Sequence, residues 1–163
     1  MKLRSRLVIG AFAGIAGTMA MTSAMRRLHA RLPEEERYPL TPREIIDAAA
    51  APPDEAAKDL TTAAHFAYGA ACGALLAAAD PNMGKARGAA AGAAIWLASY
   101  MGWVPALSLL KPATEHPARR NALMIAVHLV WGTSTVAAMR ELVAARQTIF
   151  AAGDDRDAQE PTA

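Results

Sequence analysis

An uncharged stretch of twenty-three residues, Gly88 to Leu110, constrains the fold of this chain more than any other part of its sequence. The stretch reads GAAAGAAIWLASYMGWVPALSLL and contains no Asp, Glu, Lys or Arg. At 1.5 Å per residue, a helix of this length extends about 34 Å, which is enough to cross the hydrocarbon core of a bilayer. We therefore interpret it as a membrane span, loosened near its end by Pro105.

Three further apolar windows become visible once this span is accepted. Charged residues are concentrated between the windows, although the whole chain is 53% hydrophobic and 20% charged. We predict an all-α fold, an integral membrane four-helix bundle over residues 1–150 followed by a disordered polar tail over 151–163. The short loop after the second span predicts that spans two and three are antiparallel neighbours. The four predicted spans cover residues 7–25, 63–79, 88–110 and 121–139.

Two alternatives accompany this interpretation. Lys2, Arg4 and Arg6 precede the first window, as they would in a secretory signal, and residues 22–24 are small enough for a cleavage site. The window is nearer a full span than a signal core, so we expect it to be retained. The second window is mostly alanine, which partitions weakly into lipid, and a soluble alanine-rich bundle is the other alternative.

Glycines recur within the windows at spacings of three and four residues. This spacing places them on one face of a helix, where they let neighbouring helices approach closely in lipid. The predicted packing positions are Gly10, Gly14, Gly17, Gly69, Gly73, Gly88, Gly92 and Gly132.

The long first loop contains one helix signal. Thr41-Pro42-Arg43-Glu44 matches a capping box with proline at the first helical position. We predict a short amphipathic helix from Pro42 to about Ala51. Its apolar face, with Ile45 and Ile46, is expected to rest on the membrane surface or on the bundle.

Histidines give the main functional hypothesis. With four spans, all four histidines map to one side of the membrane or its leaflet, and His65 and His128 lie within spans. An ionisable residue inside a membrane indicates a functional site, although a hydrogen-bonded packing role is the simpler interpretation. A candidate pocket for a small molecule, metal or haem would combine these two with Asn121, Tyr100 and Trp103.

Other signals restrict the function without defining it. No phosphate loop, nucleophile elbow, zinc-protease or C-x-x-C motif occurs, so we assign no catalytic or metal-binding residue and do not favour an enzyme. A net charge of +2 without a basic stripe argues against nucleic-acid binding. The single cysteine, Cys72, is interpreted as a packing residue. Lys and Arg number eight on the terminal side and nine on the other, which leaves the orientation open.

Four segments also carry a family resemblance. They resemble small bacterial inner-membrane proteins of the YagU type, which are grouped as domains of unknown function. The resemblance covers most of residues 7 to 140 and implies a multi-pass four-helix fold in the bacterial inner membrane. It identifies no functional residue. The expected role is structural or interactive, as a homo-oligomer or subunit of a membrane complex; the alternative is ligand, metal or haem binding through His65 and His128. The segments are AGIAGTMAMTSAM, HFAYGAACGALLAAA, ASYMGWVPALSLL and RRNALMIAVHLVWG.

Overall fold

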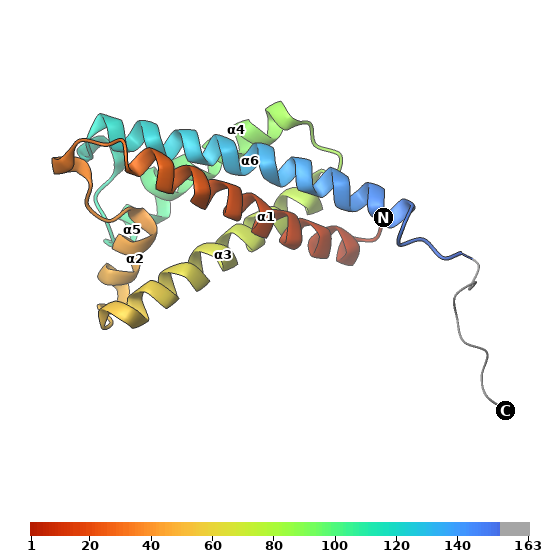
Figure 1. Cartoon of the computed structure of the whole chain (residues 1–163), viewed down its shortest axis with the longest axis horizontal. Coiled ribbons are helices and arrows are strands. Elements are labelled where there is room, and N and C mark those ends of the chain that lie inside the picture. Colours follow the sequence, from red (N-terminus) through yellow and green to blue (C-terminus); the bar gives the residue numbers. More distant parts are fainter. Residues whose placement is uncertain (154–163) are drawn as a thin grey trace.

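The computed structural model describes residues 1–153, and this part of the chain is helical without any β-strand, which confirms the all-α prediction (Figure 1). A five-residue π-helical turn, Ser99–Trp103, connects α4 to α5, and single 3₁₀ turns lie at Glu34–Glu36 and Ala113–Glu115. Of the predicted disordered tail, residues 154–163 lie outside the described part. The α-helices are α1 (Leu3–His29), α2 (Thr41–Ala50), α3 (Asp54–Ala79), α4 (Lys85–Ala98), α5 (Val104–Ala106) and α6 (Ala118–Gln147).

Three long helices contain the first, second and fourth predicted spans. By length and composition, α1, α3 and α6 are apolar enough to cross a membrane, with 27, 26 and 30 residues. These lengths correspond to about 40–45 Å of helix. Each helix extends beyond its apolar window, because the flanking charged segments continue the same helical turns without a glycine or proline to interrupt them.

The third predicted span does not form one regular helix. Its α-helical part, α4, ends at Ala98, and the π turn and α5 carry the helical path only as far as Ala106. Val104 N–H bonds to the carbonyl of Ser99, five residues back, and Pro105 follows with no N–H of its own. The expected loosening therefore begins six residues before the proline, and the stretch 107–110 is not helical.

Glycines mark the crossings of the long helices. A Cβ placed on Gly10 or Gly14 of α1 would collide with the backbone of α3 at Gly73 or Gly69, respectively. On the other side of the molecule, Gly88 and Gly92 of α4 are similarly close to α6, around Gly132. Gly17 lies against Thr135, where α1 crosses α6. Close backbone approach of this kind is available only where the Cβ is missing.

The order of packing is α3 on α1, α1 on α6, and α6 on α4. The predicted antiparallel neighbours, spans two and three, meet less closely than expected: α3 and α4 make at most isolated contacts, and Tyr68 of α3 contacts Ser99 and Trp103 of the π turn. In Figure 1, α3 diverges from the other long helices toward the end of the molecule where α2 and α5 lie. The short loop between α3 and α4 holds only their near ends together, because their glycine faces pack on different partners.

Two buried clusters form the core at either end of α1. One contains Met21, Met25, Val127 and Trp131, and the other contains Ile9, Ala13, Ala77 and Met139. Both rely on residues spaced three, four or seven apart along α1 and α6, as expected for helix faces in contact. The interior therefore follows the α1–α6 contact, with α3 and α4 added on its two sides.

The short helix in the first loop forms as predicted, but its capping box does not. Thr41 is already inside α2, no side chain caps the helix, and the Thr41 hydroxyl donates to the hydroxyl of Tyr100 at 3.1 Å. A tertiary hydrogen bond has thus replaced the local one. The amphipathic face packs on the bundle rather than only on a membrane surface, because Ile45 and Ile46 line an internal cavity.

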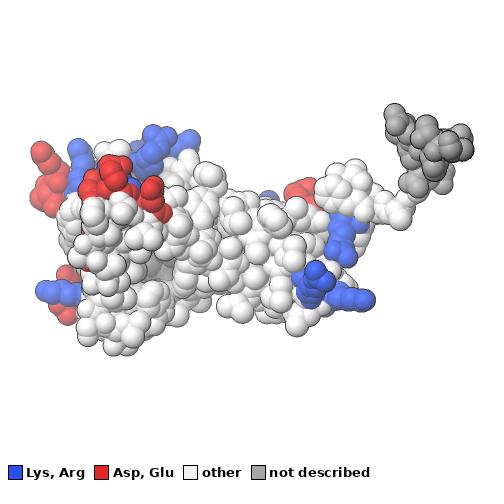
Figure 2. Space-filling model, turned by 90° about the horizontal axis from the view of Figure 1, so that it is seen from below, with Lys and Arg blue, Asp and Glu red and all other residues white. Residues whose placement is uncertain are grey.

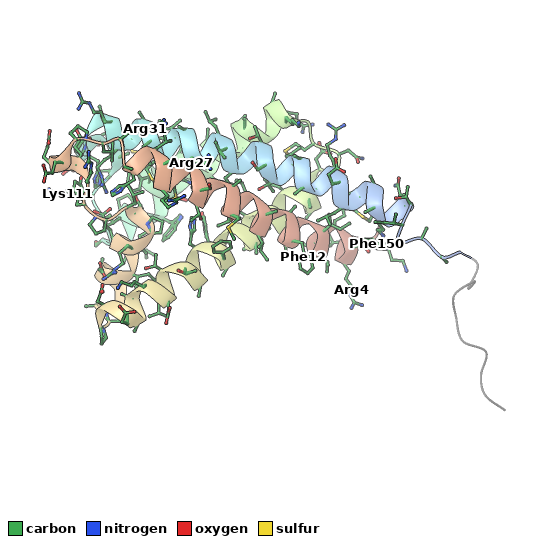
Figure 3. The ribbon with its side chains drawn as sticks, viewed as in Figure 1. Arg4, Phe12, Arg27, Arg31, Lys111 and Phe150 are labelled. Carbon is green, nitrogen blue, oxygen red and sulfur yellow. The ribbon has the colours of Figure 1, made fainter. Side chains whose placement is uncertain are left out.

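Two ends of the molecule can be distinguished in Figure 3. Arg31 and Lys111 lie at the end that carries the first and third loops, and Arg4 and Phe150 lie at the opposite end. Phe12 lies between them on the outer side of α1, with 62% of its surface exposed.

Candidate functional site

A cavity of about 260 Å³ lies where α3 diverges from the rest of the bundle. Its walls come from α1, α2, α3, α6 and the helical path that runs from α4 through the π turn. Bundle interiors between helices are common places for ligand sites. The π turn is consistent with this, since such turns occur often at functional sites.

His65 of α3 and His128 of α6 both line this cavity. His128 Nδ1 donates to the carbonyl of Met124 at 2.7 Å, so the neutral ring presents Nε2 as an acceptor. His65 Nε2 is buried and has no partner among the described residues. Two histidines from helices far apart in sequence therefore lie in the wall of the same cavity.

Several aromatic side chains lie among the aliphatic and small residues of the remaining walls. Every tryptophan of the chain, Trp96, Trp103 and Trp131, lines the cavity. Trp131 donates its N–H to Thr18 at 3.2 Å, whereas the N–H of Trp96 is buried without a partner among the described residues. The Trp96 and Tyr100 rings lie 6.1 Å apart in a tilted arrangement. Buried indole N–H groups usually find an acceptor, so Trp96 is a second unfilled polar group.

Four of the five predicted pocket residues line the cavity: His65, His128, Tyr100 and Trp103. Asn121 does not. Its amide donates to the carbonyl of Ala113 at 2.6 Å and so ties the third loop to the start of α6. The seven-residue step from Asn121 to His128 places both on one helix face, but two turns of helix separate them along the axis.

Sequence reasoning assigned no role to Arg120, which is 3% exposed. Its guanidinium donates to the carbonyls of Glu36, Tyr38 and Pro39 at 2.7–3.0 Å, and it lies 3.5 Å above the ring of Tyr38. It also pairs with Glu44 at 3.3 Å. We call residues 36–50 the cover segment. Arg120 fastens this segment, and with it α2, over the cavity.

A signal for Arg120 does exist in the sequence. It lies four, seven and eleven residues before Met124, Val127 and Trp131, which form the buried stripe of α6. A charge in register with an apolar stripe indicates a buried partner. Trp96 and Cys72 lie on similar stripes, and both line the cavity in addition to their packing role.

Two ionisable groups of the cover segment have pKa values shifted by their immediate surroundings. Burial raises the pKa of the Glu44 carboxyl, an effect that Arg120 and His116 only partly oppose. Hydrogen bonds that Arg43 donates to the carboxylates of Asp47 and Asp54 raise the pKa of its guanidinium. The other two histidines also lie near this segment: His29 is 3.1 Å from the Tyr38 carbonyl, and His116 stacks on Tyr100 at 5.2 Å.

In the described part of the chain, no three His, Cys, Asp or Glu side chains come together as possible metal ligands. Haem ligation requires only two ring nitrogens, and His65 and His128 both face the cavity. The chemical character of the site is otherwise that of an apolar, aromatic pocket with a few unfilled hydrogen-bonding groups.

Charge is distributed along the molecule in a way that agrees with its apolar helices. Figure 2 shows Lys, Arg, Asp and Glu gathered at the two ends, with a belt free of charge between them on the face in view. Large apolar side chains are exposed along α1, including Val8, Phe12 and Met19 at 50–62%. Taken with the three long apolar helices, this pattern is that of a helical protein suited to a membrane. No family model, curated protein or solved structure matches the chain.

Proposed function

We propose that this chain is a multi-pass membrane protein that binds a small ligand in the cavity between α3 and the rest of the bundle. The observation that carries the proposal is the convergence of His65, His128 and Trp96, three residues from three helices, on one apolar cavity. Two of their polar atoms, His65 Nε2 and Trp96 Nε1, are buried and unfilled. Leaving such groups unpaired costs about 1–3 kcal/mol each, a cost that a bound ligand would remove.

We propose that the lipid bilayer is the main partner of this fold. We propose four crossings, by α1, α3, α6 and the path from α4 to α5. The residues from Lys85 to Ala106 are continuous and helical, and at about 1.5 Å each they are long enough to cross the hydrocarbon core. The resemblance of the apolar segments to YagU-type proteins supports a bacterial inner-membrane location.

Native mass spectrometry of the protein, extracted from its own membranes in mild detergent, tests the proposal. We expect a small molecule bound in a fixed ratio and released by organic solvent. The double variant His65→Gln/His128→Gln should lose it. His29→Gln, which changes a histidine outside the cavity lining, is the matched control and should retain it.

Other outcomes would redirect the assignment. A haem absorption band that disappears in the double variant would identify the ligand as haem. An empty cavity, together with other polypeptides in fixed ratio, would contradict ligand binding and favour the role of a subunit in a membrane complex. An empty homo-oligomer would also contradict the proposal.

A further inference from the structure

We infer that the ligand is a neutral, lipid-soluble molecule with a planar ring head bearing carbonyl or hydroxyl oxygens, the chemistry of isoprenoid quinones and quinols. This inference rests on the proposed function and narrows it to a chemical class. It is built from the charge of the cavity, the shape of its walls, its hydrogen-bonding groups and the position of its rim.

The cavity selects against charged ligands. None of its lining residues is Asp, Glu, Lys or Arg. An ion placed there would lack a counter-charge, and burying an unpaired charge is far more costly than burying a neutral polar group. A phosphate, a carboxylate or a free metal ion therefore does not fit, whereas a neutral molecule does.

The walls favour a flat ring. Trp96, Tyr100 and Trp131 present aromatic surfaces from two different helical segments, and ring faces pack well against planar π-systems. The volume of about 260 Å³ lies just below the range of roughly 300 to 1,000 Å³ typical of ligand pockets. This space suits a single substituted ring and leaves little room for more of the molecule.

The residues of the cavity wall carry both hydrogen-bond donors and acceptors. The Trp96 N–H is a donor only, and His128 Nε2 is an acceptor while Nδ1 bonds to Met124. His65 Nε2 can act in either way, depending on where the ring carries its proton. A quinone offers carbonyl acceptors where a quinol offers hydroxyl donors, so this mixed set can bind either form.

The rim of the cavity gives a path for an apolar tail. Tyr68 of α3 and Trp103 of the π turn line the cavity and are 44% and 39% exposed. Their rings are 6.2 Å apart, and the Tyr68 hydroxyl lies 2.9 Å from Ser99 Oγ. Ser99 already donates to the Ile95 carbonyl, so Tyr68 is the donor in this bond. This bridge joins α3 to the π turn, beyond the end of α4.

This rim lies between α3 and the π turn, in two segments that we place in the membrane. A ligand can therefore enter from the lipid, with its ring inside and its chain between the hydrocarbon tails. Because the ring fills the space available, the tail has to remain outside. A water-soluble compound of the same ring chemistry would lack this route.

The test uses the protein in nanodiscs of synthetic phospholipid free of quinone, titrated with decylubiquinone. Because every tryptophan lines the cavity, intrinsic fluorescence reports directly on occupancy. We expect saturable quenching at one quinone per chain, not displaced by dodecanol, which has a tail and a hydroxyl but no ring. Trp96→Phe keeps a ring and removes the N–H, and should weaken binding about five- to tenfold.

His29→Gln, which changes a histidine outside the cavity lining, is the matched control and should change the affinity less than twofold. His65→Gln, as a second variant, should also weaken binding, which keeps the test decisive if Trp96→Phe does not fold. Quenching that never saturates, or that is equal in all variants, would overturn the inference. If quinone fails but the native protein carries another small molecule, the ligand class is wrong and the binding function stands. If neither binds, both proposals fail.

Discussion

Gly14 and Gly102 both lie in helical segments, but only Gly14 lies against the backbone of another helix. A Cβ on Gly14 would meet the carbonyl of Gly69, whereas nothing lies within 4 Å of a Cβ on Gly102. The eight glycines predicted to pack helices all leave no room for a Cβ: at Gly17, Gly69 and Gly88 the nearest atom is a side chain of another helix, and at the other five it is the backbone of another helix. Their spacing was readable because helix geometry alone places positions three and four apart on one face. Which helix each face would meet could not be read in the same way.

Gly14→Ala is predicted to destabilise the fold by about 1–3 kcal/mol, because the added methyl forces α1 and α3 apart. Gly102→Ala should be neutral or slightly stabilising, since alanine is the better helix former. Thermal unfolding in detergent, followed by circular dichroism, measures both. Equal melting temperatures for the two variants would show that the α1–α3 crossing is looser than the structure indicates.

Individual site residues were predictable to the extent that chemistry marks them. Histidine within an apolar window is unusual, and this signal identified His65 and His128. Asn121 was grouped with them because spacing shows which face of a helix a residue lies on. Spacing does not show whether the residue is level with the cavity, which depends on how the helices pack. The Thr41 capping box did not form for a related reason: the Thr41 hydroxyl donates its hydrogen bond to Tyr100, fifty-nine residues away in the sequence.

At the scale of elements, the cover segment depends on one buried arginine. Arg120→Gln removes the cation that bonds three carbonyls and Glu44, and breaking such a buried pair typically costs about 3 kcal/mol or more. We expect hydrogen exchange of residues 36–50 to accelerate while α1 and α6 stay protected. Arg119→Gln, at the exposed neighbouring position, is the control. Unchanged exchange in the Arg120 variant would show that α2 is held by its apolar face alone.

Glu44 gives the cover segment a dependence on pH. Its pKa is raised in the folded state above the ordinary value of 4.5, mainly by burial. The folded state therefore holds this proton more tightly than the unfolded state, and stability declines as pH rises through the raised pKa. Wild-type protein should lose more thermal stability between pH 4 and pH 7 than Glu44→Gln does. A greater loss in the variant would mean that the Arg120 pair dominates over burial.

Helix positions were largely predictable, and helix partners were not. The apolar windows predicted the central parts of α1, α3 and α6, because charge and hydropathy change sharply at the edges of these windows. The end of α4 at Ala98 was missed, since the π turn follows from the arrangement around Ser99 and Pro105 and not from composition. The divergence of α3 from α4 creates the cavity, and a short connecting loop gave no indication of it.

On the face that Figure 2 shows, an apolar belt joins two charged ends. We place this belt in a bilayer, with the termini on one side and the cover segment near the other side. The ligand cavity then opens within the membrane, at the end where the loops hold Arg120 and the histidines. Every functional inference above depends on this placement.

Cysteine labelling of intact and permeabilised cells tests that placement most directly. Cys72→Ser removes the only cysteine, and single cysteines are then introduced at Arg4, Phe12 and Lys111. A membrane-impermeant maleimide should label positions 4 and 111 from opposite sides and should leave position 12 unlabelled in both preparations. Labelling of position 12 as rapid as that of the other two, or labelling of positions 4 and 111 from the same side, would contradict a bundle that crosses the membrane four times.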